Sequence, residues 1–179
     1  FLGLSLAWLL GSIHLGDRPP GTILAPLHRS TETLEHLAAG EKVRLYRKRG
    51  IGTVTMPSPA ELNQFQDALE LIRKHAETGA PEPLDQARGY LHQLHYTLEL
   101  VEPDRLCLRE EEPGRGWGFY VINLKASTGL LVEVPAPLEE WSVMESAVQL
   151  YGRLNGSTLA IAGGARLAER DGSSDVLTN

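Results

Sequence analysis

The sequence lacks several features that define common protein classes. It has one cysteine, Cys107, among 179 residues, so it can form no intrachain disulfide and no zinc site built from cysteines. It contains no Gly-x-Gly-x-x-Gly, no Gly-Lys-Ser/Thr and no Gly-x-Ser-x-Gly motif, which are the signatures of dinucleotide sites, P-loops and many serine hydrolases. It has no internal repeat and no low-complexity region. These absences leave an ordinary globular chain without a diagnostic catalytic motif.

The chain also lacks an excess of positive charge. It carries 17 basic and 23 acidic residues, a net charge of −6 and a pI near 5.5. Nucleic acid is therefore excluded as the main partner, because phosphate binding needs a clustered basic surface. The one basic cluster is Arg44, Arg47, Lys48 and Arg49, and we interpret it as the solvated tip of a β-hairpin.

No apolar run is long enough to cross a bilayer, which takes roughly 20 residues. The longest uncharged apolar stretch is residues 1–13. We interpret the chain as a fragment of a longer protein and residues 1–16 as the remnant of a membrane anchor or signal segment. A buried N-terminal helix is the alternative. Residues 17–29 are then a linker, and residues 30–179 a single α/β domain on the periplasmic or extracellular side of the membrane.

The most informative stretch is residues 116–166. It contains a compact apolar run at residues 130–134, an amphipathic segment that ends at Leu154, and a second apolar run at 158–162 that leads into Gly163-Gly164. This pattern predicts a βαβ unit with two parallel, buried strands. The fold class is therefore α/β, with a mixed sheet flanked by helices, and a ligand is expected just past the carboxyl ends of these strands.

Two further helices and a hairpin are predicted from local signals. Ser58-Pro59-Ala60-Glu61 is a capping box with proline at the first helical position, which predicts a helix that runs to about Glu77. A second helix is expected from about Leu84, followed by an antiparallel pair formed by residues 96–101 and 105–110. Cys107, in the second strand of that pair, is expected to be buried.

The preceding stretch predicts a short helix followed by a hairpin. Ser30 is expected to cap a helix over residues 31–39, which Gly40 ends. Residues 42–47 and 51–56 then alternate or cluster β-forming residues around a turn, and this pattern is typical of two paired strands.

Few side chains are marked for chemistry. His92 and His95 are three positions apart, so on one helix they would share a face and could both bind a metal ion; the alternative is two surface histidines. Glu133 sits in an apolar strand, where a carboxylate is costly unless it is paired. It either contributes to a polar site at the strand end or points to solvent beside a sheet edge. Gly163-Gly164 predicts a tight, left-handed exit from the strand, and Arg166 beside it can grip a carboxylate.

The last third of the chain resembles the N-formylglutamate amidohydrolases and poly-γ-glutamate hydrolases, which are zinc-peptidase-like α/β proteins. The resemblance is carried by Val132-Glu-Val-Pro-Ala-Pro137, the helix after it, Ala160-Ile-Ala-Gly-Gly-Ala-Arg166 and Ser174-Asp-Val176. The family pattern has a histidine after the first proline, before the arginine and after the Asp-Val pair. This chain has Ala136, Ala165 and Thr178 there.

The resemblance implies an amide hydrolase that has lost its zinc, since alanine supplies no metal ligand. Glu133, Arg166 and Asp175 would remain as a polar pocket for an anionic or amide-containing ligand, such as a fragment of a bacterial cell envelope or polymer. No cofactor is then expected. The first alternative is an active hydrolase that holds zinc through Glu133, Asp175 and one of His92 or His95. The second is a structural interaction domain of a larger membrane protein.

Overall fold

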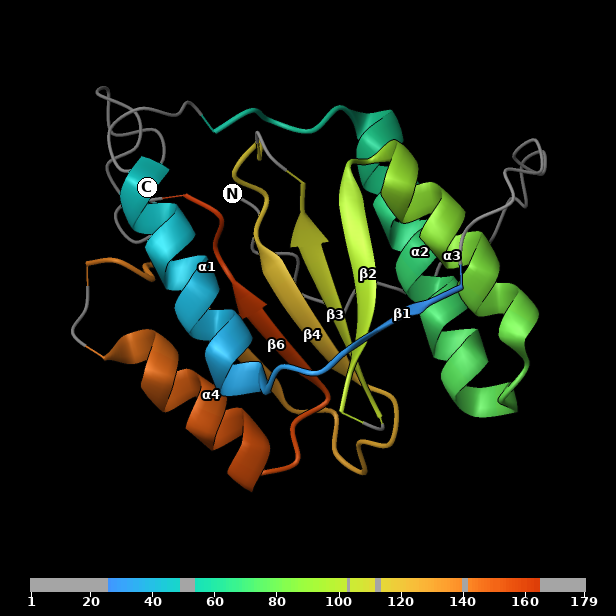
Figure 1. The fold of residues 1–179 in the computed structure, drawn as a ribbon. Coiled ribbons are helices and arrows are strands. Elements are labelled where there is room, and N and C mark those ends of the chain that lie inside the picture. Colours follow the sequence, from blue (N-terminus) through green and yellow to red (C-terminus); the bar gives the residue numbers. More distant parts are fainter. Residues whose placement is uncertain (1–25, 49–53, 103, 112–113, 140–141, 165–179) are drawn as a thin grey trace.

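The computed structural model describes residues 26–48, 54–102, 104–111, 114–139 and 142–164. These residues form four helices and six strands (Figure 1). In chain order the elements are β1 (His28–Ser30), α1 (Leu34–Lys48), α2 (Pro59–Thr78), α3 (Pro81–Gln93), β2 (Tyr96–Val101), β3 (Arg105–Glu110), β4 (Phe119–Asn123), β5 (Leu131–Val134), α4 (Val143–Arg153) and β6 (Thr158–Ile161).

The strands form one mixed sheet in the order β1-β2-β3-β4-β6-β5. β2, β3 and β4 form an antiparallel meander, and β6 is antiparallel to β4. β5 and β6 are parallel and are connected through α4, so the predicted βαβ unit and the mixed α/β sheet are confirmed. β1 pairs in parallel with β2 at the other edge. It begins at His28, so the sheet includes the last two residues of the predicted linker, 17–29.

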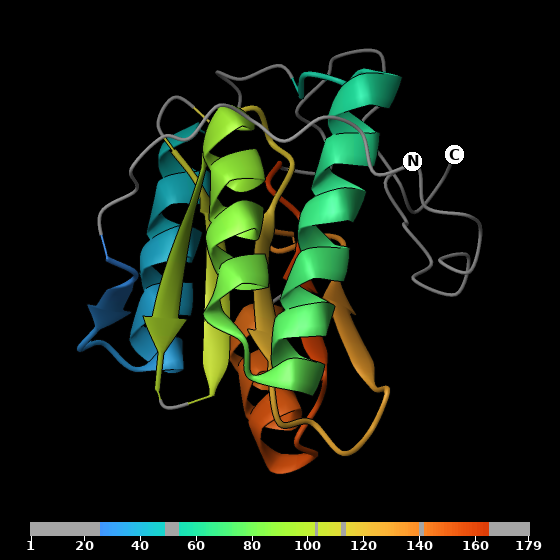
Figure 2. The same ribbon diagram turned by 90° about the vertical axis from the view of Figure 1, so that its right-hand side faces the viewer.

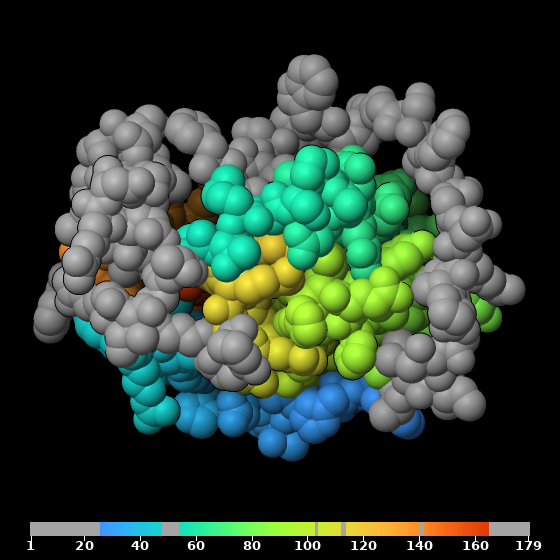
Figure 3. Space-filling model, turned by 90° about the horizontal axis from the view of Figure 1, so that it is seen from above, coloured from blue at the N-terminus to red at the C-terminus, as the bar shows by residue number. Residues whose placement is uncertain are grey.

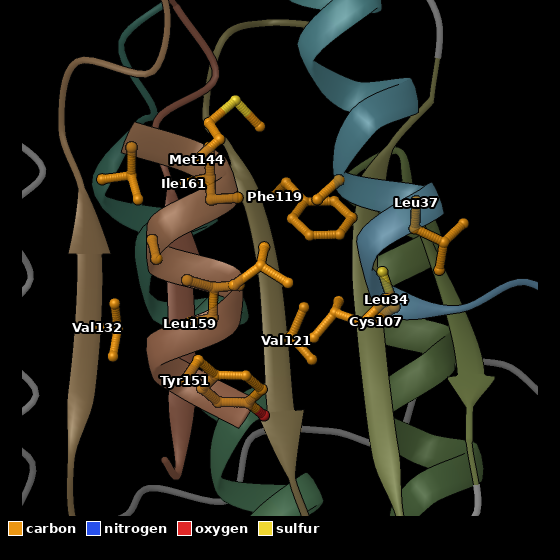
Figure 4. Packing of buried hydrophobic residues seen from close by; sticks show 14 of the residues in the cluster. Leu34, Leu37, Cys107, Phe119, Val121, Val132, Met144, Tyr151, Leu159 and Ile161 are labelled. Carbon is orange, nitrogen blue, oxygen red and sulfur yellow. The ribbon is translucent and has the colours of Figure 1, made fainter. Parts of the chain in front are cut away.

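Helices cover both faces of the sheet (Figures 1 and 2). α1 and α4 lie on one face, where they bury a cluster that includes Leu34, Leu37, Phe119, Val132, Val134, Met144, Tyr151 and Ile161 (Figure 4). α2 and α3 lie on the other face, where they bury a cluster that includes Phe65, Ile72, Leu91, Tyr96, Leu106, Leu108 and Trp117. The central strands β3 and β4 therefore alternate their side chains between two separate cores.

The residues that begin and end α2 have the roles that the sequence predicts. The Ser58 hydroxyl accepts a hydrogen bond from the Glu61 amide, the Glu61 carboxylate accepts one from the Ser58 amide at 2.8 Å, and Pro59 begins the helix. Gly79 ends it in the left-handed conformation, with φ of 69°. The predicted second helix is α3, and the predicted antiparallel pair is β2 with β3. Cys107 is buried, and this burial raises the pKa of its thiol.

The helix predicted over residues 31–39 is present, but its predicted cap, its predicted end and the strand predicted after it are wrong. Ser30 belongs to β1, and it is the hydroxyl of Thr33 that accepts a hydrogen bond from the His36 amide at the start of α1. α1 then continues through Gly40 to Lys48, so the predicted hairpin strand at residues 42–47 is helical. Of the other predicted strand, 51–56, residues 54–56 are described and form no strand.

Part of the reason lies in a buried carboxylate that conceals the helical pattern. Leu37, Glu41 and Leu45 recur at four-residue spacing on the buried face of α1, and Glu41 is only 3% exposed. Its carboxylate is 2.6 Å from Nε of Arg44 and 3.9 Å from Nε of Arg109 on β3. A buried charge of this kind is tolerated because it is paired. In sequence, however, Gly40 resembles a helix end and Val43 and Leu45 alternate with charged residues, so the segment resembles β-structure, although Val43 is exposed on α1.

In the part of the chain that the structure describes, no helix is long and apolar enough to cross a membrane. The predicted apolar anchor, residues 1–16, lies outside the described residues.

Gly40 and Gly79 provide a matched test of α1. Nothing lies within 4 Å of a Cβ built on either residue, so only the backbone conformation differs between the two. Gly40→Ala should raise the free energy of unfolding by about 0.5–1 kcal/mol, because alanine favours a helix interior. Gly79→Ala should lower it by about 1 kcal/mol, because of its positive φ. Urea denaturation followed by circular dichroism measures both, and a destabilising Gly40→Ala would show that α1 ends where the sequence predicts.

Candidate functional site

The carboxyl ends of β5 and β6 lie together at one end of the sheet. We call residues 135–137 and 162–164, which follow these strands, the strand-end edge. The Ala162 amide donates a hydrogen bond to the Val134 carbonyl at 3.0 Å, so the parallel pairing extends to this point. In open α/β sheets, ligands bind beyond the carboxyl ends of parallel strands. The topology therefore makes this edge the candidate site, as the sequence predicts.

The glycines at this edge allow two backbone segments to lie in close contact. A Cβ on Gly163 would lie 2.6 Å from the carbonyl carbon of Gly116, and one on Gly118 would lie 2.5 Å from the Ile161 carbonyl oxygen. Only glycine fits either position. Gly116 and Gly118 have positive φ, whereas Gly163 and Gly164 do not. The predicted left-handed exit from β6 is therefore wrong. Glycine is required at position 163 because a side chain would not fit there, and not because of its backbone conformation.

The loop that enters β4 is held by a buried carboxylate. Glu110, at the end of β3, is 5% exposed. Its Oε1 accepts a hydrogen bond from the Arg115 amide and its Oε2 one from the Gly116 amide, both at 3.0 Å. A carboxylate with two backbone donors is well satisfied even when buried. Glu110 therefore positions the loop of residues 114–118 against the strand-end edge.

Three contacts engage the guanidinium of Arg115 in this loop, although its buried Nε has no hydrogen-bond partner among the described residues. Its guanidinium lies 3.4 Å from the centre of the Trp117 ring, a cation–π arrangement. Nη1 lies 2.7 Å from Oε1 of Glu61 on α2, and Nη2 donates to the Leu94 carbonyl. The Arg115 cation therefore ties the loop to both α2 and the end of α3.

The segment before α2 passes over this loop. The Thr55 amide donates to the Arg115 carbonyl at 3.0 Å, and the indole Nε1 of Trp117 donates to the Thr55 carbonyl at 2.5 Å. Cγ2 of Val54 would lie 3.2 Å from a Cβ on Gly116 and 2.8 Å from one on Gly164. Residues 54 and 55 therefore cover the glycine contact from outside.

Glu133 does not enter a buried polar site. It lies on β5, the last strand of the sheet, and its side chain is exposed, so the second of the two interpretations of Glu133 is the one that the structure supports. Within the sheet it aligns with Ala160 and Tyr120 in one row on the α2 face. Burial raises the pKa of Tyr120, and the carboxylates of Glu110 and Glu133 raise it further.

The histidines lie far from Glu133. His92 is exposed on α3, whereas His95 lies beyond the helix, in a turn with φ of 57°, so the two do not share a helical face. His95 leads into β2, and β2 is four strand spacings from β5. At about 4.8 Å per spacing, roughly 19 Å separates β2 from β5 across the sheet. No group of three potential metal ligands occurs in the described part of the chain.

The other predicted site residues, Arg166 and Asp175, lie outside the described residues. The sequence interpretation missed the residues that organise this end of the molecule: Glu110, Arg115 and Trp117. A signal was present, since Gly114-Arg-Gly-Trp-Gly118 directly precedes a strand. Three glycines in five residues indicate close backbone approach or special conformations, but the partners of that loop come from distant parts of the chain.

Comparison of the chain with protein-family models, curated proteins and solved structures finds no match.

The loop depends on both oxygens of Glu110. Glu110→Gln should lower the free energy of unfolding by about 2–3 kcal/mol, because the amide nitrogen of glutamine meets one of the two buried N–H donors. Glu111→Gln removes the same charge one residue later and should change stability by less than about 0.5 kcal/mol. Urea denaturation of the three proteins measures this, and equal effects of the two substitutions would contradict the assigned role.

Proposed function

We propose that this chain is a non-catalytic binding or scaffolding domain that takes an anionic or amide-containing ligand at its strand-end edge. It is related to metal-dependent amide hydrolases but has lost their zinc site. It is tethered to a membrane through residues 1–13, with the domain on the periplasmic or extracellular side, where fragments of the cell envelope or of polymers are available.

One observation carries the proposal. The parallel strands β5 and β6 end side by side at a glycine-lined edge, and the first residue at which the resembling hydrolases carry a histidine is Ala136, which is 3% exposed. A buried methyl group at this position packs into the protein instead of facing a ligand. Both features support a ligand site that keeps its location but has a packing residue where the resembling hydrolases have a metal-binding side chain.

The charged groups near the edge also favour binding over catalysis. Glu110 holds two backbone amides, and Arg115 is engaged by Glu61 and Trp117. A general acid or base must exchange protons with a substrate, and a nucleophile must reach it. Groups committed to the fold in this way serve to make the edge rigid, which favours ligand binding because little order is lost on association.

Binding and metal content test the proposal together. The purified full chain should contain less than about 0.1 zinc per protein by mass spectrometry, and it should bind a γ-linked glutamate oligomer in calorimetry, a probe that is both anionic and rich in amides. The α-linked oligomer of equal length has the same charge and is the control for nonspecific attraction. Binding to the strand-end edge should be stronger for one isomer than for the other, because amide geometry differs.

Near-stoichiometric zinc together with release of glutamate from the oligomer would overturn the non-catalytic assignment and favour the active hydrolase. If both isomers bind equally and salt weakens the binding, the attraction is due to charge alone, and this result would contradict the assigned ligand class.

The tether is tested separately with lipid vesicles. The full chain should co-sediment with phosphatidylglycerol and phosphatidylcholine vesicles, whereas the chain without residues 1–16 should remain in the supernatant, because the apolar run provides the membrane affinity. Leu9→Asp, a single charge in the middle of that run, should weaken co-sedimentation at least threefold, given that burying a charge in a bilayer costs about 2.5–3.5 kcal/mol. Equal sedimentation of all three proteins would rule out the tether.

A further inference from the structure

Residues 54–57 cross the end of the sheet, and we call them the strap. In Figure 1 they run over the top of the sheet toward the start of α2, so the chain passes from the face covered by α1 to the face covered by α2. Seen from above, the teal residues that include the strap and the start of α2 lie against the yellow residues of β4 and its preceding loop (Figure 3). The strap therefore covers the end of the sheet at which the proposed ligand would bind.

The backbone of one residue, Thr55, holds the strap in place. The N–H and the C=O of Thr55 both form hydrogen bonds with the loop, the first to the Arg115 carbonyl and the second from the Trp117 indole. The side chain of Thr55 is exposed and makes no part of this pairing. Arg115 and Trp117 thus present one acceptor and one donor at the spacing of a single backbone residue. That is the recognition of an extended peptide amide, independent of its side chain.

The residue before Thr55 packs its side chain over glycines, which have no side chain of their own. Val54 lies over Gly116 and Gly164, and a Cβ on Gly164 would come within 2.8 Å of its Cγ2. The loop beneath is fixed because Gly163 and Gly116 meet backbone to backbone. None of the four residues of the strap is fully buried: Val54 and Pro57 are half-buried, Thr55 is exposed, and Met56 is 66% exposed. Segments that bury little apolar surface open locally without global unfolding.

We propose that Thr55 occupies a binding position for the backbone N–H and C=O of one residue, which we call the amide position, and that an extended, peptide-like ligand replaces the strap there. This inference rests on the proposed function in taking the strand-end edge as the ligand site, and it narrows the ligand to one with an N–H and a C=O in backbone-like order and a small apolar group before them. The strap then acts as an internal competitor. The apparent affinity for ligand is reduced by the fraction of molecules in which the strap is closed.

The test opens the strap and offers its own sequence as the probe. Thr55→Pro removes the N–H that binds the Arg115 carbonyl but leaves Trp117 and the glycines unchanged. Met56→Ala is the matched control, since it alters the same segment at a highly exposed side chain. The probe is acetyl-Val-Thr-Met-amide, and acetyl-Val-Pro-Met-amide, which lacks the central N–H, is its control. Binding is followed by nuclear magnetic resonance at the Trp117 indole N–H.

In the Thr55→Pro protein, the Trp117 indole resonance should shift on addition of acetyl-Val-Thr-Met-amide and stay in place with the proline peptide. Affinity should be at least about fivefold higher than for the wild type or for Met56→Ala, because neither of these has its strap opened. If Thr55→Pro does not fold, Val54→Gly opens the strap by removing the side chain over Gly116 and Gly164. No shift of the indole resonance at millimolar peptide in a folded variant would overturn the inference.

The γ-linked glutamate oligomer separates this inference from the proposed function. If the peptide binds at Trp117 but no variant binds the oligomer, the amide position stands and the proposed ligand class fails. If the oligomer binds the wild type and Thr55→Pro equally without moving the indole resonance, the proposed function stands and the strap inference fails.

Discussion

The contact between the backbone at Gly116 to Gly118 and the backbone at Gly163 determines how the two halves of the sheet meet. It joins the start of β4, which belongs to the antiparallel meander, to the end of β6, which belongs to the βαβ unit. Neither partner tolerates a Cβ, so the approach is closer than side chains permit. Glu110, Arg115 and the strap all act on this loop, and their positions follow from the same contact.

The elements that were predicted correctly from sequence are those whose signals are local. The capping box at Ser58, the glycine that ends α2, and the antiparallel pair β2–β3 each depend on residues within a few positions of one another. The parallel β5–β6 pair was also predictable, because an amphipathic segment between two apolar runs has few other arrangements. In these segments the capping residues, the local propensities and the hydrophobic pattern all favour the same structure.

The bounds of α1 and the residues that organise the site were not predicted, because some of their determinants are not local. Glu41 pairs with its neighbour Arg44, and also with Arg109, which lies 68 positions later on β3, from the difference of the two residue numbers. Without that partner, a glutamate on the apolar face argues against a helix. The role of Glu133 was ambiguous in sequence. It alternates with apolar residues along β5, and only the strand order shows that β5 lies at an edge of the sheet, where such a residue can face solvent. Its exposure then needs no special explanation.

The end of the sheet uses its polar side chains to hold itself together, and this limits what it can recognise. The Glu110 carboxylate holds two backbone amides and the Arg115 guanidinium pairs with Glu61, so a ligand that needed either group would first have to break these contacts, which carries a cost. The bonds to Thr55 differ, because the N–H and the C=O of one residue of a peptide-like ligand can replace them without leaving a donor or an acceptor of the loop unsatisfied. Exchange of one backbone residue for another is therefore the least costly way for a ligand to enter this edge, and that cost, more than the presence of charge, decides which chemistry the domain can bind.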